Sequence, residues 1–207
     1  MADESVILAI DVGSSSCKVT IVDHNGRACG STAATYAQET RVELNGIVEQ
    51  RPADWWSALV VAANELLPQV GQSPVAAVAL SGMMQCLVLV DKTAKPLRPS
   101  IQYNDARAKD EAAVLEDLAG GAAVLAREIG NWKGPLSLPA KLRWLMDHEA
   151  GVLGQAAVAL LGAHDYVALK LCGSCVTDAV TASTTGLLGP DGSYCIDLLR
   201  KLLPDFP

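Results

Sequence analysis

Aromatic side chains are scarce in this chain of 207 residues: Phe, Trp and Tyr make up 4%, and Phe occurs once. Because half of all residues are hydrophobic, a large core must be built from Val, Leu, Ile and Ala. A chain of this length forms one large domain or two small ones. Neither an internal repeat nor a low-complexity linker divides it, so we expect one domain over residues 1–207.

The chain also has few positive charges and lacks long apolar runs. The net charge is −7 and the isoelectric point about 4.9, which argues against a nucleic acid or an anionic membrane as partner. The most apolar stretches, 75–90 and 151–163, contain polar residues such as Ser81 and Gln155 and fall short of a membrane span. The chain starts with acidic residues, and the apolar run 6–10 is too short for a secretory signal. We therefore expect a soluble, cytoplasmic protein.

Cysteine and histidine show no metal-binding spacing. The six cysteines are scattered in a chain too large to need disulfides. Cys172 and Cys175 have the spacing of a redox pair, but they follow a helix-like run, which favours buried thiols. His24, His148 and His164 are predicted to be surface or capping residues.

The most informative stretch joins two apolar runs, 6–10 and 19–22, through a polar glycine loop at 11–18. Asn25 and Gly26 follow, a strong hairpin signal because both residue types tolerate positive φ. The chain thus begins strand, loop, strand, turn, strand. A Rossmann or P-loop protein would place a helix directly after the first glycine loop, so this order indicates another fold.

The composition of this loop suits phosphate. Gly13 has no Cβ, so backbone N–H groups can approach an anion closely. Ser14, Ser15 and Ser16 add hydroxyl donors. Asp11 ends a predicted buried strand, where a carboxylate can hold Mg²⁺ directly or through water. The alternative is a plain β-turn, because aspartate, glycine and serine are ordinary turn formers.

Periodicity and turn signals predict the remaining elements. Helices are predicted at 52–67, 139–146, 164–171 and 196–203, strands at 75–80, 86–90, 100–104 and 156–161, and a further helix start at 105–107. The strands 75–80 and 156–161 are predicted to be buried, and Trp55 and Trp56 are predicted to lie in the core. Gly173 is placed to end the third helix. Strands and helices alternate after an antiparallel start, which fits an α/β domain with a mixed sheet.

Seven segments, taken in order, resemble the N-terminal domain of the FGGY carbohydrate kinases, with a xylulokinase-like pattern. They are 11–18, 49–56 (the family's EQ-x-P-x-x-W-W), 82–86 (GQMHG), 103–107 (WNDGR), 139–144 (APKLLW), 164–167 (KDYL) and 177–185 (TD-x-x-x-AS-x-T). The resemblance implies the ribonuclease-H-like fold of the actin, hexokinase and Hsp70 superfamily. That fold is α/β, with a mixed sheet that opens with antiparallel hairpins and is flanked by helices.

The resemblance also implies an activity: transfer of the γ-phosphoryl group of ATP to a hydroxyl of a sugar, either a pentulose or a polyol. ATP and Mg²⁺ would be the cofactors. Asp11 would hold Mg²⁺, and Gly13, Ser14 and Ser15 would line the phosphates, with Ser14 where the family usually has threonine. Lys18 would support this loop or be a solvated strand residue.

Five residues would face the sugar: Met84, Gln85, Tyr103, Asn104 and Asp105. Gln85 stands where xylulokinases have histidine, and an amide cannot act as an acid or base at neutral pH. Tyr103 replaces tryptophan, keeping a flat face and adding a hydroxyl. The alternative role for Asn104 and Asp105 is helix capping. Arg107 would pair with Asp105 or lie near the substrate.

Members of this family are considerably longer. Their general base is an aspartate in a glycine-rich segment that does not occur before Pro207, and Asp178 and Asp191 stand in the wrong context, as cap or turn residues. The chain is therefore expected to be a sugar-binding N-terminal fragment, inactive alone, that lacks the base and the C-terminal nucleotide-binding domain. An exposed face normally covered by that domain would favour self-association, so a homodimer is also expected.

Three alternatives stay open. A non-catalytic sugar-kinase-like module predicts sugar or partner binding without ATP turnover in any longer form. A different ATPase of the superfamily would act on an acid or a protein, which the segments 103–107 and 182–185 argue against. A phosphate-binding α/β protein outside the superfamily is disfavoured by the hairpin after the glycine loop.

Overall fold

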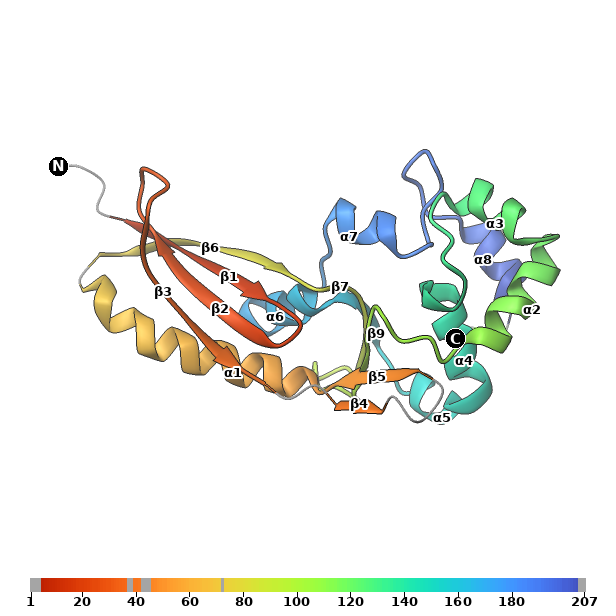
Figure 1. The fold of residues 1–207 in the computed structure, drawn as a ribbon, viewed down its shortest axis with the longest axis horizontal. Coiled ribbons are helices and arrows are strands. Elements are labelled where there is room, and N and C mark those ends of the chain that lie inside the picture. The colour runs from red at the N-terminus through yellow and green to blue at the C-terminus, as the bar shows by residue number, and fades with distance from the viewer. Residues whose placement is uncertain (1–4, 37–38, 42–45, 72, 205–207) are drawn as a thin grey trace.

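The computed structural model describes residues 5–36, 39–41, 46–71 and 73–204, so residues 1–4 of the acidic start lie outside it. A four-stranded sheet forms one end of the molecule, with strand order β3-β2-β1-β6 (Figure 1). Its strands are β1 (Val6–Val12), β2 (Ser16–Val22), β3 (Ala28–Thr35) and β6 (Val75–Gly82). The first three pair antiparallel, and β6 runs parallel to β1, which confirms the mixed sheet with an antiparallel start.

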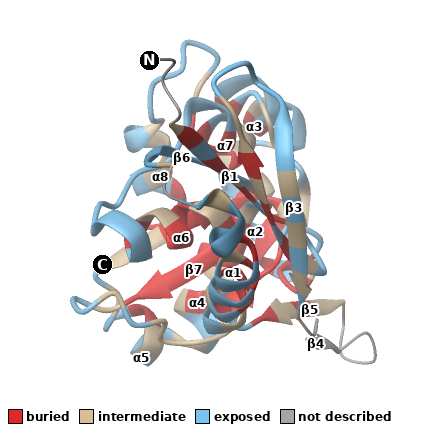
Figure 2. Ribbon diagram, turned by 90° about the vertical axis from the view of Figure 1, so that its left-hand side faces the viewer, coloured by how far each residue is buried: buried red, intermediate tan, exposed pale blue. Residues whose placement is uncertain are grey.

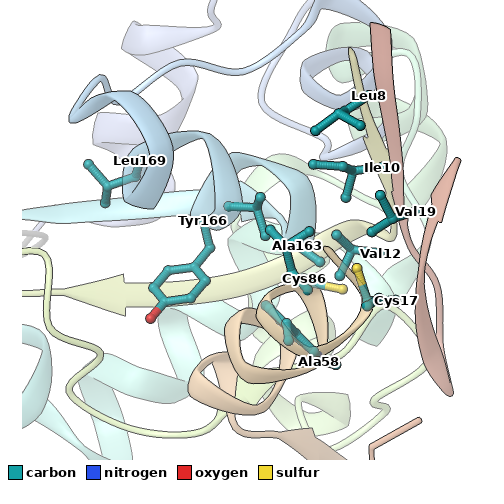
Figure 3. Packing of buried hydrophobic residues seen from close by; sticks show 14 of the residues in the cluster. Leu8, Ile10, Val12, Cys17, Val19, Ala58, Cys86, Ala163, Tyr166 and Leu169 are labelled. Carbon is teal, nitrogen blue, oxygen red and sulfur yellow. The ribbon is translucent and has the colours of Figure 1, made fainter. Parts of the chain in front are cut away.

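A long helix, α1 (Pro52–Leu66), covers one face of this sheet and is followed by the 3-10 turn η1 (Leu67–Val70). Pro52 starts α1 as predicted, because its fixed φ suits the first turn. Side chains from β1 and β2 point toward α1 and α6 (Ala163–Cys172), and together they make an aliphatic core (Figure 3). Trp55 is fully buried in this core, as predicted, whereas Trp56 is only partly buried.

A second sheet of five strands has the order β4-β5-β8-β7-β9, and all its pairings are antiparallel. Its strands are β4 (Glu39–Arg41), β5 (Ile47–Gln50), β7 (Met84–Val90), β8 (Ser100–Ile101) and β9 (Val158–Gly162). Most of β7 is buried, and it appears as the red arrow in Figure 2.

Helices on the far side of this sheet enclose a second core (Figure 1). Those that contribute side chains to this core are α2 (Lys109–Ala119), α3 (Ala122–Ile129), α4 (Leu138–His148), α5 (Ala150–Leu153) and α8 (Ile196–Leu202). Two further helical elements are η2 (Gly134–Leu136) and α7 (Ala179–Thr184). Within the described ranges, no helix combines the length and apolar character needed to cross a membrane.

The structure corrects four sequence predictions. The strand 75–80 forms, but it is not buried: Val75 and Val78 are 42% and 45% exposed, because β6 lies at the edge of its sheet. The helix expected to start at 105–107 begins at Lys109.

The third correction concerns the two spaced thiols. Cys172 and Cys175 are exposed rather than buried, because α6 ends in a left-handed Gly173 and the chain then runs along the surface.

Candidate functional site

The loop between β1 and β2, residues 13–15, is called the phosphate loop below. The Gly13 N–H donates to the Ser16 carbonyl at 3.0 Å, and a Cβ on Gly13 would lie 3.3 Å from that oxygen. The Tyr36 hydroxyl donates to the carbonyls of Gly13 and Ser16. Within the part of the chain that the structure describes, the N–H groups of Ser14 and Ser15 have no acceptor. The loop thus presents free backbone donors beside exposed hydroxyls, as an anion site requires.

Asp11 and Lys18 lie next to this loop on one face of the sheet. They are direct cross-strand partners, and Ser81 of β6 lies opposite Asp11 on its other side. These residues line a cavity of about 330 Å³. Among the residues that line this cavity Asp11 is the one carboxylate, and the described residues contain no cluster of three or more His, Cys, Asp or Glu side chains that could hold a metal ion.

The segment between β6 and β7 lies beside Val12, the residue directly before the phosphate loop. The Met83 N–H donates to the Val12 carbonyl at 3.0 Å, and a Cβ on Gly82 would approach that same oxygen to 3.0 Å. Glycine therefore permits the close approach of the two segments. Gln85 has a φ of 59°, and its amide nitrogen donates to the Thr184 carbonyl at 2.5 Å, which leaves its amide oxygen as an acceptor. Met84 is 39% exposed beside it.

Residues 102–107, called the acceptor loop below, contain three of the residues expected to face a sugar. Tyr103 and Asn104 are exposed, whereas Asp105 is fully buried. The Asp105 carboxylate accepts hydrogen bonds from the Val48 N–H at 2.6 Å and from the Arg107 guanidinium at 2.7 and 2.9 Å. Arg107 thus pairs with Asp105, and Asp105 caps no helix. Direct contact of Tyr103, Asn104 or Asp105 with a ligand stays a prediction.

A buried lysine lies beneath the acceptor loop, and the sequence indicated it only as part of a helix motif. Lys141 of α4 has no exposed surface, and its Nζ donates to the Gln102 carbonyl at 2.6 Å. Burial lowers the pKa of Lys141 to about 8, against a smaller opposing effect of Asp105. Neither periodicity nor spacing signals such a position, because lysine is rarely fully buried.

This lysine makes stability depend on pH. Between pH 8 and its ordinary pKa of 10.5, the unfolded chain holds a proton that the folded chain has lost, so stability rises with pH. Below pH 8 both states are protonated and the cost of burying the charge is constant. We expect wild type to gain about 1 kcal/mol relative to Lys141→Met between pH 8 and pH 9.

Urea denaturation at pH 7, 8 and 9 checks this. The thiols of Cys17 and Cys86, whose pKa values burial raises to about 11 and about 12, act in the opposite direction above pH 9. Lys141 lowers the pKa of Cys86 slightly, but burial keeps both thiols protonated in the folded protein up to pH 9 with or without this lysine, so their contribution cancels in the difference. Lys109→Met, at an exposed position, is the control and should give a flat difference. A flat difference for Lys141→Met as well would show that its amine stays charged in the folded protein.

His164 is the fourth correction, because its side chain is only 12% exposed. Its Nε2 lies 3.1 Å from Asp178 and 3.3 Å from Asp165. Asp178 caps α7 through the N–H groups of Val180 and Thr181, as predicted for a cap residue, and hydrogen bonds from Thr181 lower its pKa to about 2. A cavity of about 490 Å³ opens between these residues and the end of β6.

Comparison with known proteins gives these contacts a context. A profile of the FGGY family of carbohydrate kinases, N-terminal domain, matches residues 6–190. The xylulose kinase of Streptomyces coelicolor is 31% identical over 187 residues, which are 89% of this chain and 37% of that protein. The chain thus spans little more than a third of that relative.

Solved structures agree. The xylulose kinase from Rhodospirillum rubrum superposes with a TM-score of 0.86 at 27% identity, covering 95% of this chain and 41% of that one. The gluconate kinase from Lactobacillus acidophilus gives a TM-score of 0.84 at 28% identity, covering 96% and 39%.

Proposed function

The chain belongs to the FGGY family of carbohydrate kinases, and from this premise we propose that it is the sugar-binding N-terminal part of an ATP-dependent kinase for a pentulose or polyol. One observation carries the proposal. The phosphate loop and the segment with Met84 and Gln85 are joined by the Met83–Val12 hydrogen bond of 3.0 Å. Phosphoryl transfer needs donor and acceptor groups held at such close range.

On the donor side, the N–H groups of Ser14 and Ser15 and their hydroxyls bind the β- and γ-phosphates in this proposal. Lys18 adds positive charge on the same face as Asp11. A single exposed carboxylate suits Mg²⁺, which commonly takes one or two carboxylates together with phosphate oxygens and water. When bound, the ion would neutralise charge on the phosphates.

On the acceptor side, Met84 offers an apolar contact and the Gln85 amide oxygen accepts a hydrogen bond from a sugar hydroxyl. The exposed ring of Tyr103 stacks on sugar C–H groups, and Asn104 adds polar contacts. Asp105 acts through Arg107 and the Val48 N–H. We place the general base and the second nucleotide-binding domain in the part of the relatives that this chain does not span, and we propose self-association through the exposed β6 side.

The experiment is a coupled ADP-release assay on the native gene product, whose intact mass is measured first. The panel contains D-xylulose, D-ribulose, glycerol and D-gluconate, and mass spectrometry identifies the phosphorylated product. We expect turnover of a ketopentose or a polyol. The 207-residue chain alone should be slower by a factor of about 10²–10⁴ or more, since it lacks a general base in this proposal. Sugar binding by calorimetry without turnover in any form would instead support a non-catalytic module.

A further inference from the structure

Gln50, the last residue of β5, holds the phosphate loop from inside the protein. It is 1% exposed, its amide nitrogen donates to the Ser14 carbonyl at 2.7 Å, and its amide oxygen accepts from the Trp55 indole at 2.8 Å. An indole N–H only donates, so the amide oxygen must face Trp55 and the nitrogen must face Ser14. An ionised glutamate here could accept from Trp55 but could not donate to the Ser14 carbonyl.

The contact to Ser14 fixes the direction of a neighbouring donor. In a trans peptide the carbonyl of Ser14 and the N–H of Ser15 lie in one plane and point in opposite directions. Holding the Ser14 carbonyl toward the buried Gln50 therefore directs the Ser15 N–H away from the core, where an anion can reach it.

Glu49, the preceding residue, holds the acceptor loop. Its Oε1 accepts from Arg107 at 2.7 Å and from Arg98 at 2.5 Å, and Arg107 in turn binds Asp105. The backbone of β5 adds to this, because the Gln102 N–H donates to the Val48 carbonyl at 3.0 Å. Consecutive residues of a strand point to opposite sides, so Glu49 and Gln50 reach different loops from one short segment.

We infer that Glu49 and Gln50 are a pair of positioning residues that set the phosphate loop and the acceptor loop in register with each other. Each residue ties one loop to β5, so loss of either side chain should free that loop and leave the other in place. Their use in phosphoryl transfer rests on the proposed function, whereas the mechanical coupling is a property of the folded chain and is testable without turnover.

Hydrogen exchange on the 207-residue chain tests the coupling. The Gly13 and Tyr36 amides, bonded to Ser16 and Ser15, report on the phosphate loop, and the Gln102 and Ala106 amides report on the acceptor loop. Gln50→Leu should speed exchange at the first pair about tenfold and at the second less than about twofold. Glu49→Gln should give the reverse pattern.

The matched control is Leu66→Val, a buried change at the other end of α1 from Trp55. It lowers global stability without touching β5, so it should leave the ratio between the two reporter pairs unchanged. Exchange that rises equally in both loops for all three variants would overturn the inference, because it would show that Glu49 and Gln50 contribute only to global stability.

Steady-state kinetics of the native gene product supply the functional readout. Gln50→Leu should raise KM for MgATP about tenfold with the acceptor KM within about twofold, and Glu49→Gln should mainly raise the acceptor KM. Equal effects on both constants would contradict the inference. A wild-type protein that turns over no acceptor, with the exchange pattern intact, would overturn the proposed function and leave the coupling of the loops standing.

Discussion

Replacing Asp105 with alanine is expected to lower the free energy of unfolding by about 3 kcal/mol, because it removes the bidentate partner of a buried cation and leaves that cation with Glu49 alone. Asp105 has no exposed surface, and its carboxylate binds the Arg107 guanidinium. The Arg107 side chain is 3% exposed and lies 4.7 Å from the centre of the Trp144 ring, so water cannot replace the lost carboxylate. The Val48 N–H would lose its acceptor as well.

Urea denaturation followed by tryptophan fluorescence measures this loss. The control is Asp110→Ala, because Asp110 is an exposed residue in the first turn of α2, and the expected loss there is about 0.5 kcal/mol or less. Adding Arg107→Met to Asp105→Ala should recover part of the stability, since the buried charge that lost its bidentate partner is then gone. A loss below about 1 kcal/mol for Asp105→Ala would show that the acceptor loop opens readily to solvent.

The sequence predicted the parts of the fold whose signals are local. Asn25 and Gly26 specify the hairpin between β2 and β3, Pro52 starts α1, and Gly173 ends α6 in a left-handed conformation. Each signal acts through the backbone of a few neighbouring residues, so no distant partner is needed to interpret it. The resemblance added the family, which the profile match over residues 6–190 confirms.

The predictions that failed depend on partners far away in the sequence. The apolar strand β6 reads as buried, but burial depends on what lies beside it, and here it is an edge. The partner of Asp105 could not be predicted either, because this residue binds Val48, which lies 57 residues earlier; its contact with a sugar stays a prediction. His164 reads as a surface residue because nothing near it indicates that α7 brings Asp178 to within 3.1 Å. The helix α7 itself lies in a small, polar stretch without apolar periodicity.

The same limit applies to the site. Each of its two loops could be proposed from its own residues, because glycine, serine and aspartate suit turns and polar contacts wherever they stand. Their connection could not, since Gln50 reaches Ser14 across 36 residues and Glu49 reaches Arg107 across 58. The roles of Glu49 and Gln50 follow from the contacts that each side chain makes in the structure, and the Glu-Gln pair in the sequence does not indicate them.

Replacing Asp11 with asparagine is expected to lower kcat of the native gene product in the proposed phosphoryl transfer by a factor of about 10²–10³. In the proposed function this carboxylate holds Mg²⁺ at the phosphates, and an amide has no charge for that purpose. Asp11 is exposed at the end of β1, so the change should alter stability by about 0.5 kcal/mol or less. The measurement is steady-state ADP release at saturating acceptor, with stability checked by urea denaturation.

Asp110→Asn, which changes an exposed carboxylate on α2, is the matched control and should leave kcat unaltered. Raising the Mg²⁺ concentration should recover part of the Asp11→Asn activity, because a weakened ion site fills again by mass action. A plain β-turn predicts a different result, since a turn aspartate contributes to local structure alone. If Asp11→Asn kept kcat within about fivefold of wild type, which is little more than 1 kcal/mol in the barrier, the carboxylate would have no part in phosphoryl transfer and the turn interpretation would stand.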